Sequence, residues 1–386
     1  MNPVPMSKGR IVWLSASLAL MGVILSGAVT GRAPNHDSTY GGLKVFNEAL
    51  HYVQSNYVDR VEPDLLMAGA YQGLMAMLDS DSEYLPPGET GDNAPSAGPA
   101  DVGIVPIRSE LSMRVLAVRP GSPAGRAGVQ SGWFVRLIGD RPAREMSAAR
   151  LGRELAGPAG SKVKLTLVKP GDPKKIELEL ARETPPRQPV LISMPRPDVC
   201  HLRLLRFGPD SPEAVRLALA GVARNAVVLL DLRNNPGGSY EDAVRVANLF
   251  ISDGILARLR ERSRERAVYE ARSRDRVWEG EVVVLVDRGT AGAAELTAAA
   301  LHSRGRGRLL GEKTAGVGAF QETLALPNGG ALRLSVAKYQ DPNGKPWHAE
   351  GLTPDETIER PREDSTGDPV LDRVLGMLAG PKRKAA

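Results

Sequence analysis

Residues 226–238 read AVVLLDLRNNPGG, an apolar run that ends in two asparagines, a proline and two glycines. Such a run, bounded by turn residues, is typical of a buried strand, and residues 241–250 continue with helical spacing. Because Gly237 and Gly238 carry no side chains, their backbone amides can approach a developing oxyanion. The same pattern also fits a tight strand-to-helix turn with no chemical role.

Strands and helices alternate on both sides of this stretch. A second buried strand is predicted over residues 281–287 and helices over residues 212–223 and 292–303. Alternation of this kind predicts an α/β core, which we place at residues 190–360. A last amphipathic helix and a basic tail are expected over residues 361–386.

Short β runs separated by turns fill residues 101–181, with one helix at residues 148–155. Two segments are predicted to be linkers. Residues 87–99 are rich in glycine, proline and serine, and residues 184–190 are rich in proline. The chain therefore predicts a separate β module over residues 98–183.

The N-terminal third contains two further segments. Lys8 and Arg10 precede an apolar run over residues 11–29, which indicates a signal anchor or a signal peptide within residues 1–32. A run of about 19 residues can span a bilayer once, which favours a single membrane anchor, although residues 26–28 offer a small-residue cleavage site. We expect the remaining chain outside the cytoplasm, on the periplasmic side of the inner membrane or otherwise extracytoplasmic.

Apolar residues at helical spacing then predict a helical segment over residues 38–90, with Pro63 between two helices. The apolar positions are Leu43, Phe46, Leu50, Val53, Leu65, Leu66, Ala70, Leu74 and Met77.

Composition excludes several classes of function. Hydrophobic residues make up 42% and charged residues 25%, and the net charge of +5 comes from interleaved arginines and acids. No aromatic–basic platform accompanies that charge, so no nucleic-acid partner is expected. Cys200 is the single cysteine, and the five histidines lack paired zinc spacing, so we expect no metal and no cofactor.

Six blocks, taken in order, resemble the C-terminal-processing (tail-specific) peptidases, the PDZ-containing members of serine peptidase family S41. The blocks are residues 78–87 (LDSDSEYLPP), 121–132 (GSPAGRAGVQSG), 230–238 (LDLRNNPGG), 282–295, 311–314 (GEKT) and 327–354. The resemblance implies an α/β fold with a helical N-terminal segment, a PDZ-like β module and a ClpP/crotonase-like peptidase core.

The resemblance also implies a serine–lysine dyad, from which this chain departs at both positions. Gly292 stands where active members hold the nucleophilic serine, and Val317 where they hold the lysine base. Gln321 matches the glutamine that orients the lysine. Because glycine offers no hydroxyl and valine cannot accept a proton, we expect no intact catalytic residue and no peptidase activity.

The family pattern assigns two backbone sites as well. Gly237 and Gly238, with Ala293, correspond to the oxyanion site. The carboxylate-binding turn of the PDZ-like module would be formed by Val102, Gly103, Ile104 and Val105. Free amides there would hold a peptide C-terminus, with residues 148–155 as the other wall of the groove. The alternative is a structural β module whose groove is closed.

Neighbouring groups offer poor substitutes for the dyad. Thr290 lies two residues before the nucleophile position, and Ser239 follows the glycine turn and can face the cleft. Cys200 and His201 are adjacent, so on a strand they point to opposite faces.

The sequence thus predicts a non-catalytic envelope protein that binds protein C-terminal peptides, with an active homologous peptidase or an adaptor as a further partner. Two alternatives stay open: an active serine peptidase with an unrecognised nucleophile, and a structural envelope protein without peptide affinity.

Overall fold

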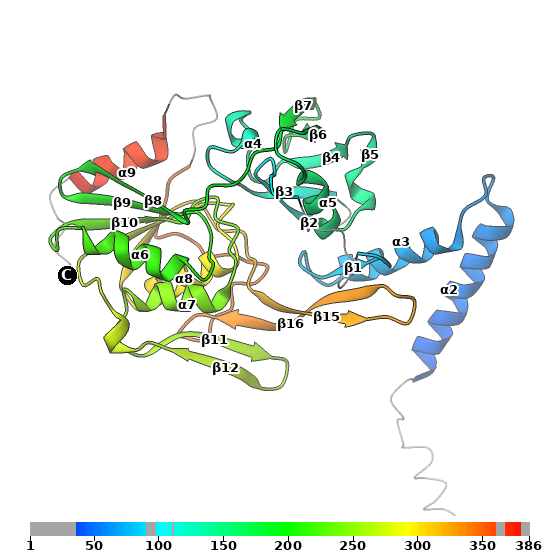
Figure 1. Ribbon diagram of the computed structural model, residues 1–386. Coiled ribbons are helices and arrows are strands. Elements are labelled where there is room, and N and C mark those ends of the chain that lie inside the picture. Colours follow the sequence, from blue (N-terminus) through cyan, green and yellow to red (C-terminus); the bar gives the residue numbers. More distant parts are fainter. Residues whose placement is uncertain (1–35, 90–97, 110–111, 360–366, 380–386) are drawn as a thin grey trace, which may run out of the picture. The chain divides into compact units, whose positions relative to one another are not determined.

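The computed structural model describes residues 36–89, 98–109, 112–359 and 367–379 (Figure 1). The predicted signal segment, residues 1–32, and the basic tail, residues 380–386, lie outside these ranges. Within the described residues, no helix combines the length and the apolar character that crossing a membrane requires. The chain divides into two compact units, residues 1–69 and 70–386.

The helical segment contains α2 (His36–Asn56) and α3 (Pro63–Ala76). Pro63 begins α3 with Asp64 in the first turn, where a fixed φ and a negative charge both suit a helix start. The predicted break at Pro63 is confirmed. Residues 83–85, expected inside the helical segment, instead form a strand, β1 (Glu83–Leu85).

Residues 98–183, the β module, contain an antiparallel sheet in the order β2-β3-β4-β6-β7, with β5 paired to β4. The strands are β2 (Ile104–Ser109), β3 (Ser112–Val118), β4 (Phe134–Ile138), β5 (Arg141–Pro142), β6 (Lys162–Val168) and β7 (Lys175–Ala181). The helices are α4 (Pro123–Arg126) and α5 (Ala148–Leu155), with a 3-10 turn, η2 (Ala143–Glu145), between them. Leu151 and Leu155 of α5 are buried against one face of the sheet, among Met113, Leu165 and Leu167.

The core holds a six-stranded sheet in the order β17-β14-β13-β10-β9-β8, parallel except for the β8–β9 pair. Its strands are β8 (Val190–Arg196), β9 (Val199–Leu204), β10 (Val227–Asp231), β13 (Val282–Val286), β14 (Gly307–Gly311) and β17 (Glu356–Thr357). Strands β10 and β13 and helix α8 confirm the predicted elements at 226–232, 281–287 and 292–303.

Helices cover both faces of this sheet, which explains why its strands read as unbroken apolar runs. Leu230 and Val284 point to the face packed by α6 (Ser211–Ala220), α7 (Tyr240–Asn248) and α8 (Ala293–Ser303). The neighbouring residues Leu229 and Val283 pack on the other face with Val370 and Val374 of α9 (Pro369–Ala379).

A third, antiparallel sheet has the order β1-β16-β11-β12, with β15 also paired to β16 (Figure 1). Its other strands are β11 (Ile255–Glu261), β12 (Glu265–Glu270), β15 (Ala319–Ala325) and β16 (Ala331–Gln340). Residues 257–278, which are rich in arginine, form most of the β11–β12 hairpin and the 3-10 turn η3 (Ser273–Asp275) that follows it. Its arginines pair with acids such as Glu265 and Glu261.

Candidate functional site

The site lies where β10 and β13 end. The carboxyl ends of neighbouring parallel strands meet at one edge of a sheet, so the loops that lead into α7 and α8 meet there. The amide of Ala291 donates to the Asn235 carbonyl at 3.0 Å and joins the two loops. A Cβ on Gly237 would lie 2.9 Å from the Ala293 nitrogen and from the Ala291 carbonyl oxygen, so only glycine fits. The structure thus brings the predicted oxyanion turn to the start of α8.

Gly292 occupies the turn into α8 with φ 57° and ψ −118°. This conformation strains any residue with a side chain. Space is not the obstacle, because a Cβ at this position would have only ordinary contacts, the nearest being the Tyr240 hydroxyl at 3.5 Å. The position that the family pattern assigns to the nucleophile therefore keeps the turn and the room for a side chain.

Glu295 joins the turn at Gly292 and the loop at Val317 through one carboxylate. Its oxygens accept hydrogen bonds from the amides of Gly292 at 3.1 Å, Gly316 at 2.8 Å and Val317 at 2.8 Å. The Thr314 hydroxyl donates to it as well. Burial raises the pKa of Glu295 to about 7, although these hydrogen bonds act to lower it.

Only half of a capping-box pattern marks Glu295 in the sequence, because the N-cap residue is Gly292 and not serine or threonine. A glutamate three residues after a helix N-cap often accepts from the N-cap amide, as Glu295 does from Gly292. Its bonds to the loop at 314–317 could not be anticipated from that local pattern.

The sequence pattern also gave no sign of a role for Tyr240, whose hydroxyl lies between Gly292 and Val317. Its hydroxyl donates to the Val317 carbonyl at 3.2 Å, and its ring stacks on Tyr339 with centroids 3.9 Å apart. Burial raises the pKa of Tyr240 well above its usual value, so the hydroxyl stays protonated as a donor. A neutral hydrogen bond from Tyr240 to the Val317 carbonyl therefore lies beside the turn at Gly292.

The predicted oxyanion amides are only partly available. The Gly237 amide donates to the Asn235 side chain at 2.9 Å, so the expectation that it is free is wrong. The side-chain oxygen of Asn235 thus accepts from the amide that lies two residues later in the turn. Among the described residues, the Gly238 amide donates to no backbone carbonyl or side chain.

Gln321, on β15, donates its side-chain amide to the Asp81 carbonyl. His348 lies in the same region: its Nε2 is 3.4 Å from an Asp79 carboxylate oxygen and its Nδ1 accepts from the Gly318 amide at 3.3 Å. Burial raises the pKa of Asp81 to about 6, with the neighbouring Asp79 charge adding to the rise. The retained glutamine thus holds the segment before β1.

The residues that could replace the dyad are already hydrogen-bonded or buried. The Ser239 hydroxyl caps α7 and accepts from the Asp242 amide at 3.1 Å. Thr290 is buried, and its hydroxyl donates to the Leu232 carbonyl at 2.9 Å, with a longer contact of 3.3 Å to an Asp287 carboxylate oxygen. Cys200 is buried, which raises its thiol pKa, while His201 bonds to Asp231 at 3.0 Å.

The predicted carboxylate-binding turn lies at the edge strand β2, beside α5. The expectation of free amides is wrong for Gly103, because its amide donates to an Asp101 carboxylate oxygen at 2.6 Å. The carbonyl of Val102 accepts from Ala124 at 3.0 Å. Val105 pairs with Ala117 of β3. Antiparallel alternation then points the Ile104 amide to the open edge.

The middle of that groove is narrow. Pro106 of β2 has no N–H to offer a peptide, and its ring lies 4.0 Å from where a Cβ on Gly152 of α5 would stand. The Arg108 guanidinium reaches the Met146 carbonyl before α5 begins. A peptide strand added here would gain fewer backbone hydrogen bonds than a fully open edge supplies.

Asn234 links the β module to the glycine turn. It adopts φ 52°, and its side-chain oxygen accepts from the Val118 amide at 3.2 Å and the Ser131 hydroxyl at 3.0 Å. Its side-chain nitrogen donates to Asp287 at 3.0 Å. One asparagine therefore contacts β3, the loop before β4 and the loop that leads to Gly292.

Known proteins resemble this chain over much of its length. The model of "Peptidase family S41" matches residues 198–358. A carboxy-terminal-processing protease of Bartonella bacilliformis is 27% identical, with 91% of this chain and 81% of that protein covered. The carboxy-terminal processing protease CtpA of Bacillus subtilis is 30% identical, with 84% of this chain and 70% of that protein covered.

Among solved structures, the photosystem II D1 C-terminal processing protease superposes with a TM-score of 0.68 at 28% identity. The superposition covers 86% of this chain and 90% of that one, so it extends beyond the residues of the family model and confirms the α/β fold. The two sequence relatives also match over most of this chain, 91% and 84% of its residues. This chain therefore belongs to peptidase family S41.

Proposed function

We propose that this S41 member binds protein C-terminal tails without hydrolysing them. The observation that carries the proposal is the contact between the Tyr240 hydroxyl and the Val317 carbonyl, beside the side-chain-free turn at Gly292. Peptide hydrolysis needs a nucleophile and a group that accepts its proton, and this arrangement supplies neither.

The choice of C-terminal tails rests on two supports. The relatives that match over most of the chain are named for processing carboxyl termini. The β module, which we take to be PDZ-like, leaves the edge strand β2 beside α5 and points the Ile104 amide outward. Backbone pairing along such an edge is the usual way these modules hold an extended peptide.

A second candidate, a structural envelope protein, is favoured by the narrow groove. Pro106 lies against α5 at Gly152, and the Gly103 amide is occupied. If these contacts persist in solution, the module holds its own parts together and takes no peptide. Peptide affinity therefore separates the two candidates.

Binding is tested with the 386-residue chain and one labelled peptide in two forms, a free C-terminal carboxylate and an amide. The tail-binding proposal expects the amide form to bind more weakly by roughly 1.5–3 kcal/mol, the scale of hydrogen bonds to a charged group. Equal affinities for the two forms would show that no carboxylate is recognised. Affinity for neither form would favour the structural role.

Hydrolysis is tested separately with unfolded and apolar-tailed substrates. The wild-type chain and Gly292→Ser should both leave substrate intact, because the added hydroxyl in the variant still lacks a base. Wild-type turnover that survives removal of contaminating peptidases would refute the non-catalytic proposal. Loss of that turnover in Ser239→Ala or Thr290→Ala would then identify the nucleophile.

We also propose that residues 11–29 anchor the protein with its folded units outside the cytoplasm, as the positive residues before the run suggest. A C-terminal reporter enzyme that works only outside the cytoplasm should be active. Activity confined to a cytoplasm-specific reporter would contradict this orientation. An active partner peptidase or an adaptor remains part of the proposal, testable by co-purification from the envelope.

A further inference from the structure

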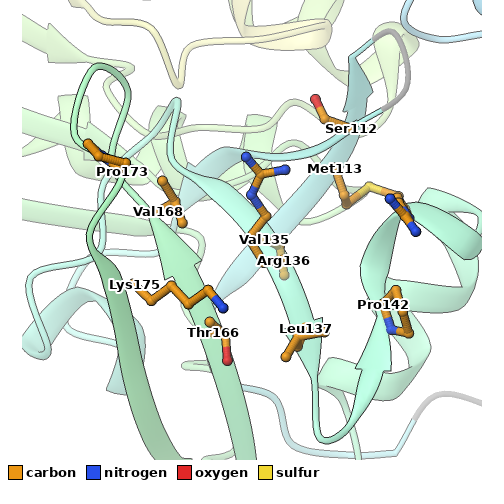
Figure 2. A pocket seen from close by; sticks show the side chains of 11 residues that line it. Ser112, Met113, Val135, Arg136, Leu137, Pro142, Thr166, Val168, Pro173 and Lys175 are labelled. Atoms are coloured by element: carbon orange, nitrogen blue, oxygen red, sulfur yellow. The ribbon is translucent and has the colours of Figure 1, made fainter.

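The β module contains a cavity of about 460 Å³ that the proposed tail binding does not use (Figure 2). Strands β3, β4, β5, β6 and β7 line it, with the loop around Pro173. Thr166 and Val168 of β6 line the cavity, whereas Leu165 and Leu167 of the same strand belong only to the cluster packed by α5. Met113 and Val135 belong to both, so the cavity borders the core of the β module.

The floor of the cavity is apolar. Leu137 and Val168 supply apolar surface, and Met113 and Val135, 0% and 3% exposed, belong to the core of the module behind it. Figure 2 shows these side chains around the hollow, with Pro142 and Pro173 on its rim. Its volume lies within the range of roughly 300–1,000 Å³ that is usual for small-molecule sites.

The charges at the cavity are all positive. Arg136, Arg144 and Lys175 line it, and no acidic or amide side chain is among its described lining residues. In Figure 2 the side chain of Arg136 points into the space between Val168 and Met113. Arg136 lies 5.7 Å from the Phe134 ring, and Arg144 reaches only the exposed Glu145 at 3.9 Å.

The lining selects a class of ligand. A sugar or an amine would find few hydrogen-bond acceptors here, whereas an anion would find three cations and the hydroxyl of Thr166. An inorganic anion alone would leave the apolar floor uncovered. We propose that this cavity binds a small carboxylate with an apolar tail, its head group held by Arg136 and Lys175 and its tail laid on Leu137 and Val168, close to the buried Met113.

This binding is independent of the proposed tail recognition, because no residue of β2 or α5 lines the cavity. Arginine pairs well with carboxylates, and a buried methylene contributes about fourfold in affinity. Affinity should therefore rise about fourfold per methylene from butanoate to octanoate, until the tail fills the cavity.

The test uses the 386-residue chain with ¹³C-labelled methionine methyl groups. Octanoate should shift the Met113 resonance saturably and leave Met194 of β8 and Met377 of α9 unchanged, since both lie outside the lining. Arg136→Gln with Lys175→Gln should weaken binding about tenfold, because two exposed charge pairs are lost. These residues are exposed, so the double variant is expected to fold.

Lys164→Gln is the matched control, because it removes a positive charge from β6 at an exposed position outside the lining. Its affinity for octanoate should stay within twofold of the wild type. Three results would each overturn the proposal: equal binding of octylamine and octanoate, an equal response of Met113 to inorganic phosphate, and undiminished octanoate binding by the double variant.

Discussion

Replacing Glu295 by glutamine tests how one carboxylate stabilises the turn at Gly292 and the loop at residues 314–317. Glu295 is fully buried, and burial raises its pKa from the usual 4.5 to about 7. Because each tenfold change in proton affinity is worth about 1.36 kcal/mol, this rise in pKa corresponds to a free-energy difference of about 3 kcal/mol between the protonated and charged forms. Since the folded pKa is the higher one, the folded state binds more protons between pH 4.5 and 7.

The sign of the pH dependence follows. The contribution of Glu295 to stability is fully present below about pH 4.5 and is lost as pH rises through 7. Glutamine does not titrate, so the unfolding free energy of wild type minus Glu295→Gln should fall by about 3 kcal/mol over that window. Asp81, whose pKa is also raised to about 6, titrates in both proteins and cancels in the difference.

Urea unfolding at half-unit steps from pH 3 to 8 measures this difference. Glu213→Gln, an exposed carboxylate on α6, controls for the chemical change and should show no such fall. A difference that rises between pH 3 and 5 would refute the reasoning. It would mean that the hydrogen bonds from Gly292, Gly316 and Val317 outweigh burial and hold the pKa of Glu295 below its usual value.

Other predictions concern the same loops. Gly292→Ser should destabilise the fold by about 1–3 kcal/mol through backbone strain at φ 57°, measured by urea unfolding, and a neutral result would show that the turn relaxes. Tyr240→Phe should cost about 1 kcal/mol by the same assay, because the Val317 carbonyl loses its donor, and no loss would make the contact incidental. Asn234→Gly keeps the backbone conformation but removes the side chain, so hydrogen exchange at the Val118 amide should accelerate, and unchanged exchange would argue against that link.

Local pattern predicted the core elements well. Strands β10 and β13 and helices α7 and α8 lie within a few residues of their predicted positions, because buried parallel strands read as continuous apolar runs. Pattern failed where partners are distant in sequence. Residues 83–85 pair with β16, some 250 positions later, and nothing within the helical segment indicates that partner.

The candidate site divides in the same way. The absence of serine at 292 and of lysine at 317 is a property of the sequence alone, since residue identity decides whether a nucleophile or a base exists. Only the tertiary structure places the Tyr240 hydroxyl on the Val317 carbonyl and occupies the Gly237 amide. It alone buries Glu295 among four donors, because distance and desolvation arise when loops far apart in the chain meet at one edge of the sheet.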